Sequence, residues 1–166
     1  MLVDTSDRSV LLTGGALVLI LAIPAAMWGI GGLDNTDEFR ELEITSDGVT
    51  VASLSVQLAE TTEEKRAGLS DHESLSKGSG MLFIHSGFGE RTYGMPDMEF
   101  GIDIAFIDEE CNITAIYSAE KPTDGESGFE PHHRYTDDGK YVLETSEGYL
   151  ADRVSVGDEV SVGSVC

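Results

Sequence analysis

Two kinds of hydrophobic pattern follow one another along the chain. Residues 10–33 form an apolar run without a single charged side chain. Such a run is long enough to cross a bilayer as a helix, which takes about 20 residues. From residue 42 onward the apolar positions come in short runs separated by Gly, Asp, Asn and Pro, a pattern typical of strands joined by turns. The sequence therefore predicts a transmembrane helix over 10–33 and a β-rich domain over 42–166.

The apolar run has an alternative interpretation as a cleaved signal peptide. A signal peptide begins with several cations and has an apolar core of about 7 to 15 residues, whereas residues 1–9 hold only Arg8, beside Asp4 and Asp7. We therefore expect a retained single-pass anchor, with 1–9 as a tail and 34–41 as an acidic linker. Arg8 ahead of the helix favours a cytoplasmic N-terminus and an extracytoplasmic domain in the cell membrane. Secretion after cleavage stays open as the alternative.

The runs after residue 42 predict a mainly β domain. Asp47 and Gly48 favour a hairpin turn, and Thr61 with Glu64 forms a capping-box pattern that predicts a short helix ended by Gly68. Many strands with one or two short helices indicate a small barrel-like domain of the β-rich α+β class. The predicted strands are Leu42–Thr45, Val49–Val51, Leu54–Leu58, Gly80–Ile84, Ile102–Ile107, Ile113–Tyr117, Tyr141–Glu144 and a closing pair within Val154–Val162, and Gly148–Arg153 is the second candidate for a helical turn.

The charge of the chain is strongly acidic. Asp and Glu number 31 against 10 Lys and Arg, so the formal net charge is −21. Binding to nucleic acid is disfavoured, because neutralising phosphates takes clustered cations. Acids scattered over the surface are typical of proteins from high-salt cells, where salt screens their mutual repulsion. We therefore expect a halophilic protein that loosens at low salt.

The two cysteines do not have the spacing of a metal site. Cys166 is the last residue, and chain ends tend to fray, so we expect Cys111 and Cys166 to be free thiols. A disulfide between them stays open as the alternative.

The stretch from Arg91 to Asp108 couples a polar loop to the most apolar strand. Asp103 lies inside that strand, where a carboxylate is costly unless it is hydrogen-bonded, paired or functional. Aromatic and thioether side chains near a carboxylate have the composition of a small-molecule or peptide site. The predicted ligand-binding residues are Tyr93, Met95, Asp97, Met98 and Asp103.

Asp103 and Glu144 also suggest an enzyme, because carboxylates converging from two strands could perform acid–base chemistry or hold a metal. The alternative is structural: each accepts hydrogen bonds from loop amides, or pairs with Arg66 or Arg91. We favour the structural role, because no activated nucleophile accompanies the two carboxylates.

No metal or cofactor is predicted. His132 and His133 are adjacent, and adjacent side chains of an extended segment point to opposite sides, so we expect two surface loop histidines. His72 and His85 are also expected to be polar loop residues. Thioethers could hold Cu(I), but methionine in apolar surroundings commonly fills space. The methionines concerned are Met81, Met95 and Met98.

Five ordered motifs resemble the DUF192 family of uncharacterised proteins over about residues 51–162. The resemblance is to a haloarchaeal-type, membrane-anchored member and implies a compact, barrel-like β domain, without implying a reaction. The family usually has Trp-Met-Lys-Asn-Thr where this chain has Gly94–Met98, and Gly-Leu-Met where it has Gly68–Ser70. The motifs are Glu63–Leu69, Gly80–Phe83, Met95 with Gly101–Asp103, Tyr141–Glu144 and Val156–Asp158.

Three functions are compatible with these observations. We favour a membrane-anchored extracytoplasmic binding or accessory module for a small ligand, glycan or protein partner, attached to the lipid bilayer through residues 10–33. The alternatives are an enzyme that uses Asp103 and Glu144, and a structural module of the cell envelope.

Overall fold

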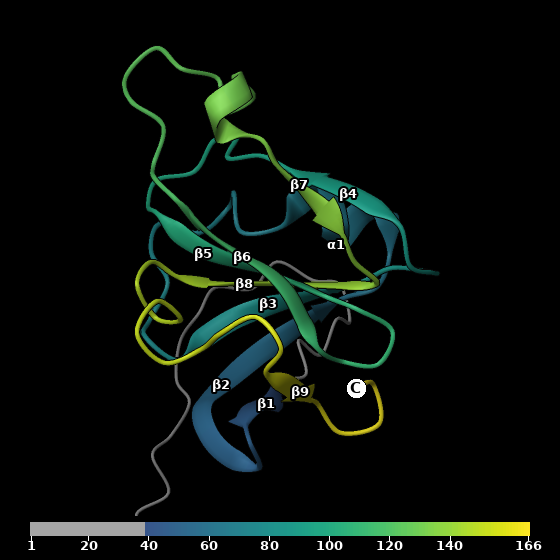
Figure 1. The fold of residues 1–166 in the computed structure, drawn as a ribbon. Helices are drawn as coiled ribbons and strands as arrows, with labels where there is room; N and C mark the ends of the chain where they lie inside the picture. The colour runs from purple at the N-terminus through teal and green to yellow at the C-terminus, as the bar shows by residue number, and fades with distance from the viewer. Residues whose placement is uncertain (1–38) are drawn as a thin grey trace, which may run out of the picture. The chain divides into compact units, whose positions relative to one another are not determined.

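The computed structural model describes residues 39–166, which form a seven-stranded sheet and a separate two-stranded sheet (Figure 1). The predicted tail 1–9, transmembrane helix 10–33 and most of the linker 34–41 lie outside the described residues. Within residues 39–166, no helix combines the length and apolarity that crossing a membrane requires. The strands and helices are β1 (Arg40–Ser46), β2 (Val49–Ala59), α1 (Thr62–Ala67), β3 (Ser79–Ile84), β4 (Glu90–Tyr93), β5 (Ile102–Ile107), β6 (Ile113–Ala119), the 3₁₀-helix η1 (Pro131–His133), β7 (Tyr135–Asp138), β8 (Tyr141–Ser146) and β9 (Glu159–Ser161).

The large sheet has the strand order β6-β5-β8-β3-β2-β1-β9. Neighbouring strands are antiparallel except β2 and β3, which run parallel and are connected through α1. The predicted turn at Asp47 and Gly48 is present, and both residues have the positive φ that such a turn requires. The prediction of a mainly β domain is confirmed. Strand β1 begins at Arg40, within the range 34–41 that was expected to be the linker.

The sheet curls without closing into a barrel. Its first core, on the inner face, includes Leu42 and Leu54 from one end of the sheet and Ala105 and Leu143 from the other. The last strand, β9, has only three residues, and they form a ladder with β1 but not with β6. An isolated bridge, Asn112 to Glu159, and neighbouring backbone hydrogen bonds between residues 111–113 and 157–160 join the two regions instead. The prediction of a barrel-like shape is therefore corrected to a curled open sheet.

A disulfide between Cys111 and Cys166 reinforces this junction. Their Cα atoms are 5.6 Å apart across 55 residues of sequence. The chain end does not fray, because the Tyr141 hydroxyl also donates a hydrogen bond to the Val165 carbonyl at 3.0 Å. The prediction of free thiols was wrong, since the curl of the sheet brings two sequence-distant segments together.

A second core covers the outer face of the sheet centre. The β4–β7 sheet packs against it through Tyr93 and Tyr135, which are paired across the two strands. Rings meet edge to face along this layer, with the centroids of Phe83 and Tyr93 5.1 Å apart. Strands β5 and β8 are consequently buried on both faces. Neither β4 nor β7 was predicted, because each is short and polar and is stabilised by a partner far away in sequence.

The predicted capping box is present in α1. The Thr61 hydroxyl accepts from the Glu64 amide at 3.2 Å, and the Glu64 carboxylate accepts from the Thr61 amide at 2.9 Å. Gly68 ends the helix as predicted, with φ +51°. Two other predictions are corrected: Gly148–Arg153 forms turns, and Val154–Val162 holds only β9, which pairs with β1.

Candidate functional site

A cavity of about 310 Å³ lies between α1, β4 and the loop 94–98. This volume is at the lower end of the range of about 300 to 1,000 Å³ that is usual for ligand pockets. Its apolar walls come from segments far apart in sequence. The larger of these apolar residues are Leu69, Phe83, Met98, Ile102 and Phe129.

The walls of the cavity are held by hydrogen bonds to loop backbone. The Ser70 hydroxyl donates to the Pro96 carbonyl at 3.0 Å, which joins the end of α1 to the loop 94–98. The Met95 amide donates to the Gly128 carbonyl at 2.9 Å, which joins the same loop to the long segment before β7. Gly128 has φ +76°, and a Cβ there would lie 2.2 Å from the Met95 oxygen. Only glycine permits this close approach.

Phe129 packs over Gly94 at the edge of the cavity. A Cβ built on Gly94 would lie 3.2 Å from the Phe129 ring. The ring therefore occupies the space that a larger side chain at position 94 would need, the position at which the resembled family usually has tryptophan. Phe129 is 54% exposed although it is a large apolar residue, so it offers a free apolar surface at this edge.

Tyr93 and His85 form a neutral hydrogen-bonded pair in the cavity wall. The Tyr93 hydroxyl lies 2.9 Å from His85 Nε2. Burial raises the pKa of Tyr93, and the nearby Glu144 raises it further. Burial, reinforced by Arg91 and Lys65, lowers the pKa of His85 to about 4. Both groups are therefore uncharged at neutral pH and are available for hydrogen bonding rather than for ion pairing.

Glu144 is a buried acid without a polar partner. Its side chain lines the cavity, and the residue is only 5% exposed. No other residue in 39–166 forms a hydrogen bond or ion pair with its carboxyl group. Burial raises the pKa of Glu144 to about 8, so the group is mainly protonated at pH 7 and can donate a hydrogen bond. A strongly shifted acid in a cavity is typical of functional sites.

Asp103 has a different environment, because it points to the other face of the sheet. In the register of β5 and β8, Asp103 is opposite Thr145, whereas Glu144 is opposite Ile104. The Asp103 carboxylate accepts hydrogen bonds from the amides of Gly148 at 3.1 Å and Leu150 at 2.8 Å. The two carboxyl groups therefore do not converge, and Asp103 fixes the turn after β8.

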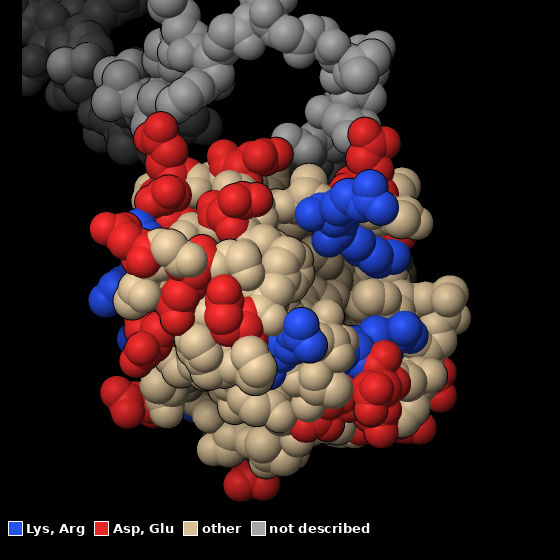
Figure 2. All heavy atoms as spheres, turned by 90° about the horizontal axis from the view of Figure 1, so that it is seen from above, with Lys and Arg blue, Asp and Glu red and all other residues tan. Residues whose placement is uncertain are grey.

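Three cations line the cavity: Lys65, Arg66 and Arg91. Arg91 donates to the carbonyls of Gly87 and Gly139, and Lys65 donates to the Glu60 carbonyl. Within residues 39–166, none of the three forms an ion pair with a carboxylate, and the lining contains no acid except Glu144. Figure 2 shows Lys and Arg side chains around a hollow on a face otherwise rich in Asp and Glu. The charged side chains that line the cavity are thus mainly positive, whereas the net charge of the protein is −21.

The five residues predicted to bind a ligand are not all at this cavity. Tyr93 and Met98 line it. Met95 is completely buried in the second core, and Asp97 is exposed in the loop with φ +57°. Asp103 is on the opposite face. Among the lining residues, His85, Arg66 and Phe129 were not predicted as site residues, because no local pattern indicates that these segments meet.

The structure also tests what the sequence predicted for the methionines and for the adjacent histidines. Met81, Met95 and Met98 all pack in the second core, which agrees with their space-filling interpretation. The prediction of two surface histidines in an extended segment holds for the exposure of His132 but was wrong for His133 and for the backbone. His132 and His133 belong to the 3₁₀-helix η1, so they are not in an extended segment, and His133 is only 4% exposed. Their rings lie on the same side, with centroids 4.3 Å apart.

Comparisons with known proteins agree with this fold. A crystal structure of a Sinorhizobium meliloti 1021 protein, provisionally described as a transcription regulator, is similar with a TM-score of 0.65 and 22% identity, over 78% of this chain and 97% of that one. A protein of unknown function from Novosphingobium aromaticivorans DSM 12444 is similar with a TM-score of 0.62 and 22% identity, over 89% of this chain and 99% of that one. No functionally curated protein matches the sequence. The family model of DUF192, described as an uncharacterised ACR, matches residues 42–162, and the chain therefore belongs to the DUF192 family.

Proposed function

We propose that residues 42–166 form an extracytoplasmic module that binds a small organic anion in the cavity beside Tyr93. The observation that carries this proposal is the charge of the lining. Lys65, Arg66 and Arg91 meet there without carboxylate partners, in a chain with three times as many acids as bases. Because unpaired cations attract an anionic group most strongly where solvent is partly excluded, this cavity favours anions over the rest of the surface.

The uncharged residues of the lining indicate which other chemical groups the ligand contains. Phe83, Met98 and Phe129 offer apolar contact to a hydrocarbon or ring portion. The protonated Glu144 carboxyl and the Tyr93 hydroxyl can bind a polar group at the inner end. A carboxylic or phosphorylated compound with an apolar portion matches this distribution of charge and polarity.

The proposal includes a membrane anchor formed by residues 10–33, in a haloarchaeal-type cell. The apolar run and the acidic composition support the anchor and the high-salt environment respectively. The Cys111–Cys166 disulfide supports a location outside the cytoplasm, because disulfides persist in oxidising compartments. Protease added to intact cells should digest the domain and leave a short N-terminal fragment protected. Full protection of the domain, or a mature chain starting near Met27, would contradict this topology.

Binding is favoured over the two alternatives. An enzyme with paired carboxylates would need Asp103 and Glu144 on one face, whereas the sheet register separates them. The Ser70 hydroxyl at the cavity is already bonded to the Pro96 carbonyl. A buried acid without a hydrogen-bond partner destabilises a protein, and replacing it usually increases stability. Its presence therefore favours a binding role over a purely structural one.

The test is a ligand-dependent thermal shift on the full chain, purified in mild detergent. Small carboxylates and phosphates are compared with their neutral amide analogues. A specific anion should raise Tm, since a ligand at 100 times its Kd contributes about 2.7 kcal/mol, and its neutral analogue should have less effect. Arg66→Gln should reduce the shift, because Arg66 is exposed at the cavity and free of partners in the described region.

The matched control is Lys77→Gln, which removes one exposed cation away from the cavity. It should leave the shift unchanged. The proposal fails if no anion stabilises the chain, or if Lys77→Gln weakens the response as much as Arg66→Gln.

A further inference from the structure

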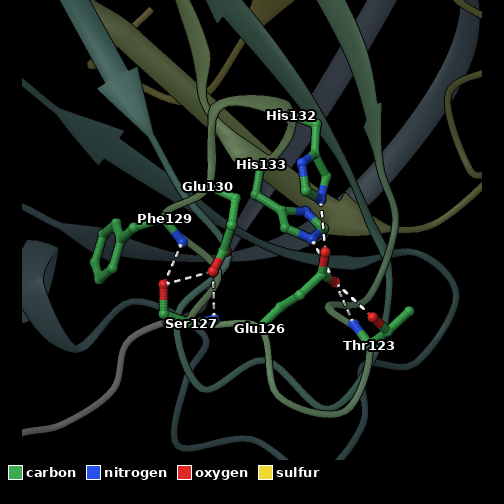
Figure 3. A network of polar contacts seen from close by, with 7 residues as sticks. All are labelled: Thr123, Glu126, Ser127, Phe129, Glu130, His132 and His133. Atoms are coloured by element: carbon green, nitrogen blue, oxygen red, sulfur yellow. Dashed lines mark hydrogen bonds and ion pairs between the residues drawn. The ribbon is translucent and has the colours of Figure 1, made fainter.

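Two imidazoles and one carboxylate converge in the long segment before β7. His132 Nε2 lies 2.8 Å from one Glu126 oxygen, and His133 Nε2 lies 3.3 Å from the other. One ligand atom from each residue can be chosen such that all lie within 4.8 Å of one another. Figure 3 shows both rings pointing at the same carboxylate.

Local structure places these side chains. Pro131 begins η1, whose turn of about three residues rotates successive side chains by about 120° instead of the 180° of a strand. The Glu126 carboxylate is oriented from behind, because it accepts from the Thr123 amide at 2.7 Å and from the Thr123 hydroxyl at 2.8 Å. These bonds are the kind of outer-shell support that metal-binding carboxylates usually have.

His133 is the buried member of the group. It is 4% exposed, and its Nδ1 is buried without a hydrogen-bond partner. Glu126 is therefore the one residue in 39–166 that forms a hydrogen bond with the His133 imidazole, and the same carboxylate also bonds to His132. A cation between the three groups would bind the Nε2 atoms of both rings and the carboxylate together.

We propose that Glu126, His132 and His133 bind a divalent transition-metal ion of the Zn²⁺ class, with a fourth position open to water or another ligand. Imidazole and carboxylate ligands suit Zn²⁺, Ni²⁺ and Cu²⁺, whereas Mg²⁺ and Ca²⁺ prefer all-oxygen sites. Zn–N and Zn–O bonds of about 2.0 to 2.1 Å in a tetrahedron place ligand atoms about 3.3 Å apart. The distances of 3.3 Å from His133 and 2.8 Å from His132 run to different Glu126 oxygens, so an ion held by one oxygen needs the imidazole on the other to move toward it. The His132 side chain is 60% exposed and has room to move.

A fourth ligand could reach the ion from solvent, because the side chains of His132 and Glu126 are 60% and 26% exposed. An ion there would brace the segment that carries Gly128 and Phe129, and hence the edge of the cavity. The site does not depend on the proposed anion binding, since none of its three ligands lines the cavity.

The experiment uses the full chain, treated with EDTA and dialysed. Titration with ZnCl₂ by calorimetry should show one site, and Co²⁺ should give the visible absorption of a tetrahedral nitrogen and oxygen environment. His132→Gln should lower Zn²⁺ affinity at least tenfold, because glutamine can still donate a hydrogen bond to Glu126 but is a poor ligand. Zn²⁺ should raise the Tm of the parent but not that of His132→Gln. Glu126→Gln is the second variant, with the same expected loss.

His72→Ala is the matched control, since His72 lies outside the group, and MgCl₂ tests for general attraction of cations to an acidic surface. The control variant should bind Zn²⁺ like the parent, and Mg²⁺ should not compete. The proposal is overturned if the parent binds no Zn²⁺, if Mg²⁺ displaces it, or if His132→Gln and Glu126→Gln bind it as tightly as His72→Ala does.

Discussion

Asp103 and Glu144 lie on the neighbouring strands β5 and β8, and their carboxyl groups point to opposite faces of the sheet. Asp103 is tied to two backbone amides of the turn after β8. Glu144 has no polar partner in the described region and faces the cavity. Two acids of nearly equal burial therefore have opposite effects on stability, because hydrogen bonds compensate the desolvation of one and not of the other.

Asp103→Asn should destabilise the domain by about 1 to 3 kcal/mol, because the amide replaces one acceptor of a charge-assisted bond with a donor facing an N–H. Chemical denaturation at pH 7 in molar KCl measures the change. Asp152→Asn, at an exposed position, is the control for loss of one negative charge. An unchanged or raised midpoint for Asp103→Asn would instead indicate a functional carboxylate.

Glu144→Gln should stabilise the domain at neutral pH. The folded state keeps a proton on Glu144 up to about pH 8, whereas the unfolded chain releases it near the ordinary value of 4.5. The stability of the parent therefore falls as pH rises from about 4.5 to about 8. Glutamine resembles the protonated acid, so the variant should lack this slope and be more stable at pH 7, by on the order of 3 kcal/mol.

Unfolding free energies at several pH values provide this measurement. Glu109→Gln, at an exposed position in the turn after β5, is the control and should retain the slope of the parent. If Glu144→Gln retains that slope as well, Glu144 titrates at an ordinary pKa in the folded protein.

Loss of the disulfide should cost about 4 kcal/mol, from the chain-entropy relation for a loop of 55 residues. Cys166→Ser and the reduced parent should unfold at similar, lower denaturant concentrations. Reducing agent should have no further effect on Cys166→Ser. Alkylation of the unreduced, unfolded parent should label neither cysteine, and labelling of both would show that the bond does not form.

Salt should stabilise the protein strongly. The net charge of −21 creates self-repulsion that is screened in molar salt, where the Debye length is about 3 Å. Raising KCl from about 0.1 M to about 3 M should increase Tm by about 5 °C or more, a change of roughly 1 kcal/mol for a domain of this size. Equal melting temperatures in the two solutions would show that the acidic surface does not limit stability.

Local signals in the sequence determined the elements that depend on neighbours in the chain. Asp47 and Gly48 specify a turn through their backbone conformation, and Thr61 with Glu64 specifies a helix start through reciprocal hydrogen bonds. The apolar run 102–107 identified the central strand. The position of Asp103 within it correctly indicated a carboxylate that needs hydrogen-bond donors, although the donors belong to a turn 45 or more residues later.

Only the tertiary structure decided which of these elements meet. Arg66, Phe129 and Glu144 come from a helix, a loop and a strand that the fold brings to one cavity, and no spacing in the chain encodes such a convergence. The disulfide and the β4–β7 pairing are equally non-local. The pattern of apolar residues in the sequence placed Asp103 and Glu144 on strands. The face of the sheet to which each side chain points depends on the register between the strands. Register is set by how the whole apolar sheet packs.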